Sequence, residues 1–143
     1  MDFHKKEFNP DFKSILTGIR VIDVSRLVAG NALTKVLADF GAEVIKIEPL
    51  AGDPFRNWHA SALPLHWKEY CRNKKSISLN LRTDEGKKIL HKLLGDADCF
   101  VENYRPGRLE QMGFGPDVVM AENEKLIMVR ISGYGQTGPY NEY

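Results

Sequence analysis

The chain is poor in cysteine, in long apolar runs and in net charge, and each shortage excludes a class of protein. Only Cys71 and Cys99 are present, without metal-ligand spacing, so neither a disulfide framework nor a metal site is expected. No apolar run approaches the ~20 residues of a membrane span, and the first residues lack an apolar signal-peptide core. The net charge of +1 carries no nucleic-acid or membrane signature. We therefore expect a cytoplasmic globular protein that binds neither nucleic acid nor membrane.

The common phosphate-binding glycine motifs are also missing. The loop after the first apolar run holds a single glycine, Gly30, where a dinucleotide-binding loop would show Gly-x-Gly-x-x-Gly. No Gly-x-x-x-x-Gly-Lys phosphate loop occurs either. Both absences disfavour NAD and ATP sites of the usual kind.

The segment 18–48 predicts a βαβ unit. Ile19–Val24 is a β-branched run typical of a buried strand, Asn31 can cap a helix that runs to about Phe40, and Val44–Ile47 is a second apolar run. Such units form parallel, doubly wound α/β sheets. Their ligands bind at the carboxyl ends of the strands, which here means the loop between the first strand and the helix.

The rest of the chain alternates in the same way. The further predicted strands are Ser76–Leu81, Cys99–Val101 and Leu126–Ile131, and the predicted helices are a short turn near Leu65–Tyr70, a helix capped by Thr83, one with Pro106 at its first position and one over Pro116–Asn123. Residues 1–17 are expected to form an N-terminal arm, which leaves 18–143 as one α/β domain with a mostly parallel sheet and helices on both faces. The chain stops directly after a strand-end loop, so we expect the domain to be incomplete.

Polar and glycine-bearing loops follow four of the predicted strands: Ser25–Asn31, Leu81–Thr83, Glu102–Gly107 and Ser132–Gly138. In a doubly wound sheet these ends converge on one crevice. A nucleotide-like ligand in that crevice and a set of ordinary turns explain the pattern about equally well. Glu48 ends the second strand, where a dinucleotide enzyme has a ribose-binding acid, but without the glycines a solvated strand end is favoured.

Cations gather at two further points. Arg72, Lys74 and Lys75 form a compact basic turn, and Arg105 lies next to a predicted helix start. Arginine beside a helix start suits phosphate, although solvated surface is the commoner explanation of such clusters. Cys71 is interpreted as a packed thiol because no base accompanies it.

Six blocks of the sequence, in order and without a gap, resemble the N-terminal part of class III CoA-transferases. The blocks are Arg20-Val-Ile-Asp-Val-Ser-Arg-Leu-Val-Ala-Gly, Leu37-Ala-Asp-Phe-Gly-Ala-Glu-Val-Ile-Lys-Ile-Glu, Gly52-Asp-Pro, Arg72-Asn-Lys-Lys-Ser-Ile, Val101-Glu-Asn-Tyr-Arg-Pro-Gly and Ser132-Gly-Tyr-Gly-Gln-Thr-Gly-Pro. This family includes formyl-CoA transferase, carnitine CoA-transferase and α-methylacyl-CoA racemase. The resemblance implies a Rossmann-like CoA-binding domain that forms the first third of a longer chain, two copies of which interlock as a homodimer.

The resemblance also implies which residues contact CoA. Carried over by position, they are Arg26, Leu27, Val28 and Ala29 in the first loop, Arg72, Asn73, Lys74 and Lys75 in the basic turn, Leu79 and Arg82 after the third strand, and Asn103, Tyr104 and Arg105 after the fourth. CoA or acyl-CoA is then a substrate, and no tightly bound cofactor is implied. The chain departs from formyl-CoA transferase at Arg26, Val28 and Gln111, so a formyl/oxalate substrate pair is not implied.

The implied reaction moves CoA from an acyl-CoA thioester to a carboxylic acid. An aspartate attacks the thioester to give a mixed anhydride, and the released CoA thiolate then forms an aspartyl-CoA thioester. That aspartate lies beyond Tyr143 in the family, so no catalytic residue is assigned here, and we expect the 143-residue chain to be inactive by itself. We also expect it to self-associate through an open sheet. The alternatives are an α-methylacyl-CoA racemase, whose His and Asp would also lie further on, and a non-catalytic CoA-binding module.

Overall fold

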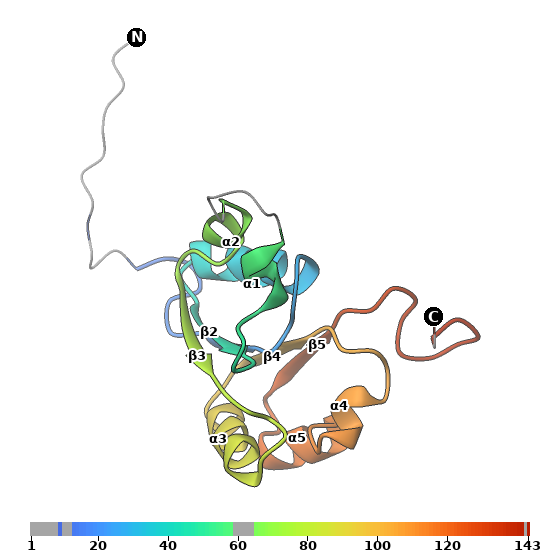
Figure 1. Cartoon of the computed structure of the whole chain (residues 1–143). Helices are drawn as coiled ribbons and strands as arrows, with labels where there is room; N and C mark the ends of the chain where they lie inside the picture. Colours follow the sequence, from blue (N-terminus) through green and yellow to red (C-terminus); the bar gives the residue numbers. More distant parts are fainter. Residues whose placement is uncertain (1–8, 10–12, 59–64, 142) are drawn as a thin grey trace.

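A parallel sheet of five strands lies at the centre of the structure, in the order β3-β2-β1-β4-β5 (Figure 1). The computed structural model describes residues 9, 13–58, 65–141 and 143. The strands are β1 Arg20–Asp23, β2 Glu43–Glu48, β3 Lys74–Ser78, β4 Cys99–Glu102 and β5 Ile127–Arg130. The order reverses between β1 and β4, as in a doubly wound sheet, so the loops that follow these two strands border the switch point.

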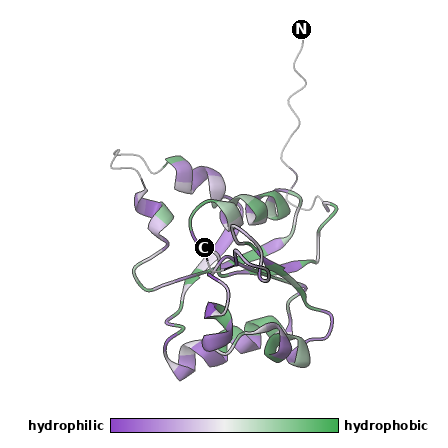
Figure 2. Cartoon of the chain, turned by 90° about the vertical axis from the view of Figure 1, so that its right-hand side faces the viewer, coloured by the Kyte–Doolittle hydropathy of each residue, from purple (hydrophilic) through white to green (hydrophobic). Residues whose placement is uncertain are grey.

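Helices cover both faces of the sheet, which confirms the predicted α/β architecture. They are α1 Ala29–Asp39, α2 Leu65–Tyr70, α3 Asp84–Gly95, α4 Arg108–Gln111 and α5 Pro116–Glu122, with a short 3-10 turn η1 Pro54–Asn57. Helices α1 and α2 lie on one face, and α3, α4 and α5 lie on the other (Figure 1). Hydrophobic and hydrophilic residues alternate along the second group, as expected for helices with one side on the sheet (Figure 2). None of the described helices is long and apolar enough to cross a membrane.

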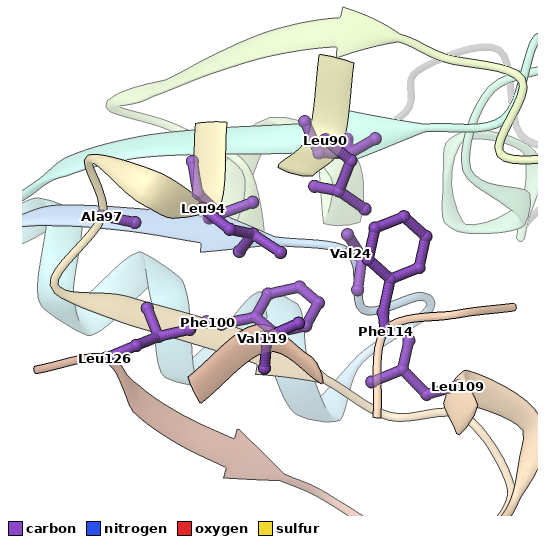
Figure 3. Close-up of a cluster of buried hydrophobic side chains, with 11 residues drawn as sticks. Val24, Leu90, Leu94, Ala97, Phe100, Leu109, Phe114, Val119 and Leu126 are labelled. Atoms are coloured by element: carbon purple, nitrogen blue, oxygen red, sulfur yellow. The ribbon is translucent and has the colours of Figure 1, made fainter. Parts of the chain in front are cut away.

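Alternate residues of β1, β2, β4 and β5 contribute to two cores. The core under α3 and α5 is the larger, and Figure 3 shows Leu90, Leu94 and Phe114 gathered around Phe100 and Val24. On the other face, the smaller core beneath α1 consists of Val21, Ala38, Ala42, Val44, Cys99 and Val101. Both faces of the central strands are therefore buried, which is why those strands appear as continuous apolar runs in the sequence.

The predicted boundaries of α1, β3 and α4 are wrong. Asn31 does not cap α1: the helix begins at Ala29, and the Asn31 side chain is buried inside its first turns, where Nδ2 donates to the Leu27 carbonyl at 2.5 Å. β3 spans Lys74–Ser78, where Ser76–Leu81 was predicted. α4 begins only at Arg108, because the preceding Gly107 has φ +79°, so Pro106 lies outside the helix.

Part of the predicted N-terminal arm can be followed. Residues 1–8 and 10–12 lie outside the described residues, whereas the amide of Leu16 donates to the Phe40 carbonyl at 3.0 Å. Leu16 also packs on the core beneath α1. The segment directly before β1 is therefore attached to the end of α1.

Replacing Thr83 by alanine is expected to lower the free energy of unfolding by about 1 kcal/mol. The Thr83 side chain caps α3 as predicted, since its Oγ1 accepts the Gly86 amide at 3.2 Å. Urea denaturation followed by circular dichroism measures the loss. Thr83→Ser should retain most of the stability, and Thr137→Ala, at an exposed threonine outside any helix, should change nothing. Equal stability of Thr83→Ala and the parent would contradict the cap.

Candidate functional site

The loops after β1 and β4 are tied together at the switch point by one side-chain amide. Asn103 Oδ1 accepts the Arg26 amide at 2.8 Å, and Asn103 Nδ2 donates to the Arg26 carbonyl at 2.8 Å. The Arg26 guanidinium lies 5.2 Å from the ring centroid of Tyr104, a cation–π distance. The position of Arg26 is thus determined by the residues that follow β4.

The loop after β1 contains a strained residue that is supported from the segment after β2. Leu27 has φ +60°, a region that branched side chains rarely occupy. Asp53 Oδ1 accepts both the Leu27 amide at 3.2 Å and the Phe55 amide at 2.9 Å. Asp53 Oδ2 accepts a hydrogen bond from Nδ2 of Asn31 at 3.2 Å. One buried carboxylate therefore holds the loop, helix α1 and the turn η1 in a fixed relation.

Four buried charges lie under α1, beside this loop. Lys46 Nζ is 3.2 Å from Asp53 Oδ2 and 3.7 Å from Asp23 Oδ1, and Lys74 Nζ is 3.6 Å from Asp23 Oδ2. None of these side chains is more than 1% exposed, and the positive and negative charges balance. Burial lowers the pKa of the Lys74 ammonium, and the Asp23 carboxylate opposes that shift.

This charged cluster is not predicted by the sequence. Lys46 lies in the run Val44–Ile47, which reads as an apolar strand, and Lys74 was assigned to a basic turn. The available signal was a charged residue between two buried apolar neighbours, as at Asp23 and Lys46. Such a residue needs a partner of opposite charge on the same face of the sheet.

Glu48 is buried and bound, so its interpretation as a solvated strand end is wrong. It is 2% exposed and forms a bidentate pair with Arg56, with Nε–Oε2 and Nη2–Oε1 distances of 2.7 Å. Ser76 and the Asp53 amide donate to the same carboxylate. Burial alone would raise the pKa of Glu48. The hydrogen bonds from Arg56, Ser76 and the Asp53 amide outweigh this effect and lower the pKa to about 2.

A pocket of about 400 Å³ opens at the carboxyl ends of the strands. We call it the strand-end pocket, and its lining residues are Arg26, Ile47, Glu48, Pro49, Leu50, Leu79, Asn80, Leu81, Arg82, Tyr104, Arg108 and Met112. Ile47, Leu79 and Met112 belong to or pack on the larger core, so part of the wall is apolar. The cations on the wall are Arg26, Arg82 and Arg108. A second pocket of about 410 Å³ lies beside Arg105 and is also lined by Pro106, Gly107, Gln136 and Asn141.

The arginines of the described residues fall into two groups. Those with a carboxylate within ion-pair distance are Arg20, Arg56, Arg72 and Arg130. Those without one among the described residues are Arg26, Arg82, Arg105 and Arg108, and every member of this group lines one of the two pockets. The pockets are therefore regions of uncompensated positive charge, which suits anionic ligands.

The structure brings together only part of the predicted CoA-contacting set. Arg26, Leu79, Arg82 and Tyr104 line the strand-end pocket and Arg105 lines the second one, whereas Asn103 joins the loops. Leu27 and Val28 lie in the same loop as Arg26, and Ala29 is the first residue of α1, but none of the three lines the strand-end pocket.

The predicted basic turn lies at the other end of β3. Lys74 is level with Val44, near the start of β2, whereas the strand-end pocket adjoins Glu48. The polar side chains are also engaged: Arg72 pairs with Asp39 and Glu69, Asn73 donates to Asp39, Lys74 pairs with Asp23, and Lys75 pairs with Glu43. A contact between Arg72–Lys75 and CoA stays a prediction.

Cys71 is not placed as a nucleophile. Burial raises the pKa of its thiol to about 11, so the protonated form dominates near neutral pH.

Known proteins resemble the chain over nearly its whole length. It is 47% identical over 130 residues to the succinyl-CoA--L-malate CoA-transferase alpha subunit of Chloroflexus aurantiacus, and the aligned region covers 87% of this chain and 30% of that protein. It is 42% identical over 131 residues to human succinyl-CoA:glutarate CoA-transferase, covering 89% and 30%. The crystal structure of Rv3272 from Mycobacterium tuberculosis superposes with a TM-score of 0.86 at 36% identity, covering 91% of this chain and 38% of that one.

The chain thus spans about 30% of the length of the curated relatives that it matches. The sequence model of CoA-transferase family III matches residues 16–143. With a match over nearly all of its residues, the chain belongs to CoA-transferase family III.

Proposed function

We propose that this chain is the N-terminal, CoA-binding part of an enzyme that moves CoA between an acyl-CoA thioester and a carboxylic acid. The observation that carries the proposal is a set of arginines around two pockets at the switch point of the sheet, none of which has a carboxylate partner in the described part of the chain. Parallel sheets bind nucleotides at such points.

The chemistry of CoA fits the strand-end pocket. Its adenine ring needs apolar surface, which Leu79 and the aliphatic part of the wall offer. Its pyrophosphate and 3′-phosphate need cations, and Arg26 and Arg82 provide guanidinium groups that can bind phosphate oxygens in pairs. The adjoining pocket at Arg105 gives the remainder of CoA a second cationic contact.

The relatives favour transfer over racemisation. The protein from Chloroflexus aurantiacus is named for succinyl-CoA and L-malate, and the human protein for succinyl-CoA and glutarate. Each name pairs an acyl-CoA with a dicarboxylic acid, which supports a dicarboxylic acid as the acceptor here. The family resemblance supports an aspartyl-CoA intermediate on a nucleophile beyond Tyr143, and hence an inactive 143-residue chain. An interlocked homodimer and a cytoplasmic location stay predictions.

CoA binding to the chain tests the proposal. Titration calorimetry should detect binding that weakens as salt is added, because the contacts are between exposed charges. Arg82→Ala should reduce the affinity about tenfold to a hundredfold, since a hydrogen bond to a charged group contributes about 1.5–3 kcal/mol. Lys125→Ala removes an exposed positive charge away from both pockets and should leave the affinity unchanged. Folded protein that binds no CoA, or an Arg82→Ala variant with full affinity, would contradict the assignment.

A further inference from the structure

We propose that Arg108 makes the strand-end pocket selective for the 3′-phosphomonoester of CoA, so that the chain distinguishes CoA from 3′-dephospho-CoA. This inference rests on the proposed CoA binding and assigns one specificity-determining residue within it. Three arginines line this pocket, and Arg108 is the one for which the family resemblance implies no contact with CoA.

The surroundings of Arg108 leave its charge available. Its Nη1 donates to Oε1 of Gln111 at 3.0 Å, and Gln111 is a neutral amide one helical turn away. An amide orients a guanidinium without cancelling its charge, whereas a carboxylate would do both. The Arg108 side chain has no other hydrogen bond to the residues that the structure describes, so its remaining N–H groups can bind a phosphate.

The acidic residues near Arg108 are already engaged. Glu110, two positions further on, pairs with Arg130 at 2.8 Å. Glu48, on the pocket wall, is held by Arg56. Neither carboxylate pairs with Arg108, so within the described residues its charge is not compensated and can attract an anionic ligand.

The backbone that carries Arg108 is firmly anchored. Leu109, the next residue of α4, is fully buried in the larger core, and Phe114 packs in the same core. Arg108 is therefore presented to the pocket from a fixed helix, while its own side chain remains solvent-accessible. Substitution of such a side chain should not unfold the chain.

The amount of charge indicates which phosphate is bound. Arg26, Arg82 and Arg108 all face one pocket of about 400 Å³, which suits an anion of more than one charge. A terminal phosphomonoester carries about −1.5 to −2 charge near pH 7, and its three free oxygens can accept from two arginines at once. Each of the two phosphoryl groups in the pyrophosphate of CoA carries only one negative charge. The 3′-phosphate, with its higher charge on one group, is therefore the better partner for two guanidinium groups.

The test compares CoA with 3′-dephospho-CoA, which keeps the pyrophosphate and lacks only the 3′-phosphate. The parent chain should bind CoA at least about tenfold more tightly than 3′-dephospho-CoA. Arg108→Gln should remove most of this preference and leave the affinity for 3′-dephospho-CoA within about twofold of the parent, within the range of ordinary surface substitutions. Arg108→Lys, which keeps the charge but not the planar fork, should retain part of the preference. Lys125→Gln is the charge-matched control.

The outcomes separate this inference from the proposed function. If neither nucleotide binds to the folded chain, CoA binding itself is overturned. If the parent binds both nucleotides equally, or if Arg108→Gln weakens both by the same factor, the chain binds CoA but Arg108 does not read the 3′-phosphate. Loss of the preference in Arg108→Gln alone supports the assignment.

Discussion

Lys46→Met should lower the free energy of unfolding by about 3–5 kcal/mol, because it leaves buried carboxylates without their counter-charge. The Lys46 side chain is 1% exposed, and its Nζ lies 3.2 Å from Asp53 Oδ2 and 3.7 Å from Asp23 Oδ1. It also donates to the Ser25 carbonyl at 2.5 Å. Methionine has similar bulk but no donor and no charge, so Lys74 alone would have to compensate both aspartates. Urea denaturation at neutral pH measures the loss.

The matched control for Lys46→Met is Lys75→Met. Lys75 also lies in the sheet and pairs with a carboxylate, Glu43, but its side chain is 70% exposed. Exposed pairs contribute about 0–1 kcal/mol, so this variant should unfold nearly as the parent does. A loss below about 1 kcal/mol in Lys46→Met would mean that water or rearrangement compensates the aspartates, contrary to the buried network described here.

Gly30→Ala is expected to destabilise the chain by about 1–3 kcal/mol and to weaken CoA binding. Alanine normally favours a helix over glycine by about 1 kcal/mol, so the sign here depends on packing. A Cβ at position 30 would lie 2.0 Å from Ser25 Oγ and 2.2 Å from Ser25 Cβ, far inside contact distance. Either the loop after β1 or the start of α1 must move, and Arg26 would move with it. Urea denaturation and CoA calorimetry together measure both effects.

Two variants test whether the contact with Ser25 is the cause. Gly95 is the last residue of α3, and a Cβ added there has no neighbour within 4 Å among the residues that the structure describes, so Gly95→Ala should not destabilise the chain. Ser25→Gly combined with Gly30→Ala removes the colliding atoms and should recover part of the lost affinity, although it also removes the hydrogen bond from Ser25 Oγ to Asp23. Normal stability and CoA affinity in Gly30→Ala alone would show that the loop tolerates displacement.

The periodicity of the sequence predicted the sheet well. The order of strands and helices follows from β-branched runs such as Ile19–Val24 and from the helix signal at Thr83, because these patterns reflect local backbone preferences and burial. Parallel pairing also follows from the sequence, since each connection between two predicted strands, its helix included, has the dozen or more residues that a crossover needs. The errors at Asn31 and Pro106 arose because polar and proline residues were assigned their commonest local roles.

Part of the candidate site was predicted and part was not. Arg26, Arg82 and Tyr104 follow strands in the sequence, and strand ends of a doubly wound sheet converge, so their shared pocket was foreseeable. The ion pairs of the basic turn were not predicted, because Arg72 and Lys75 are typical of solvated surface in the sequence. Nothing in the local sequence indicates that Asp39 and Glu43 lie beside them.

The sequence by itself thus determined the succession of elements, the sheet class and the family, because these depend on residues that are near neighbours in the chain or on motifs in fixed order. Only the tertiary structure decided which charges are compensated. Under α1, charged residues from separate segments form ion pairs that stabilise the fold. They are Asp23, Lys46, Asp53 and Lys74. The four arginines that line the pockets have no carboxylate within ion-pair distance among the described residues, so their charge remains available to a ligand. They are Arg26, Arg82, Arg105 and Arg108. The physical reason is that ion pairing depends on distance in space, and the fold sets that distance between segments remote in sequence.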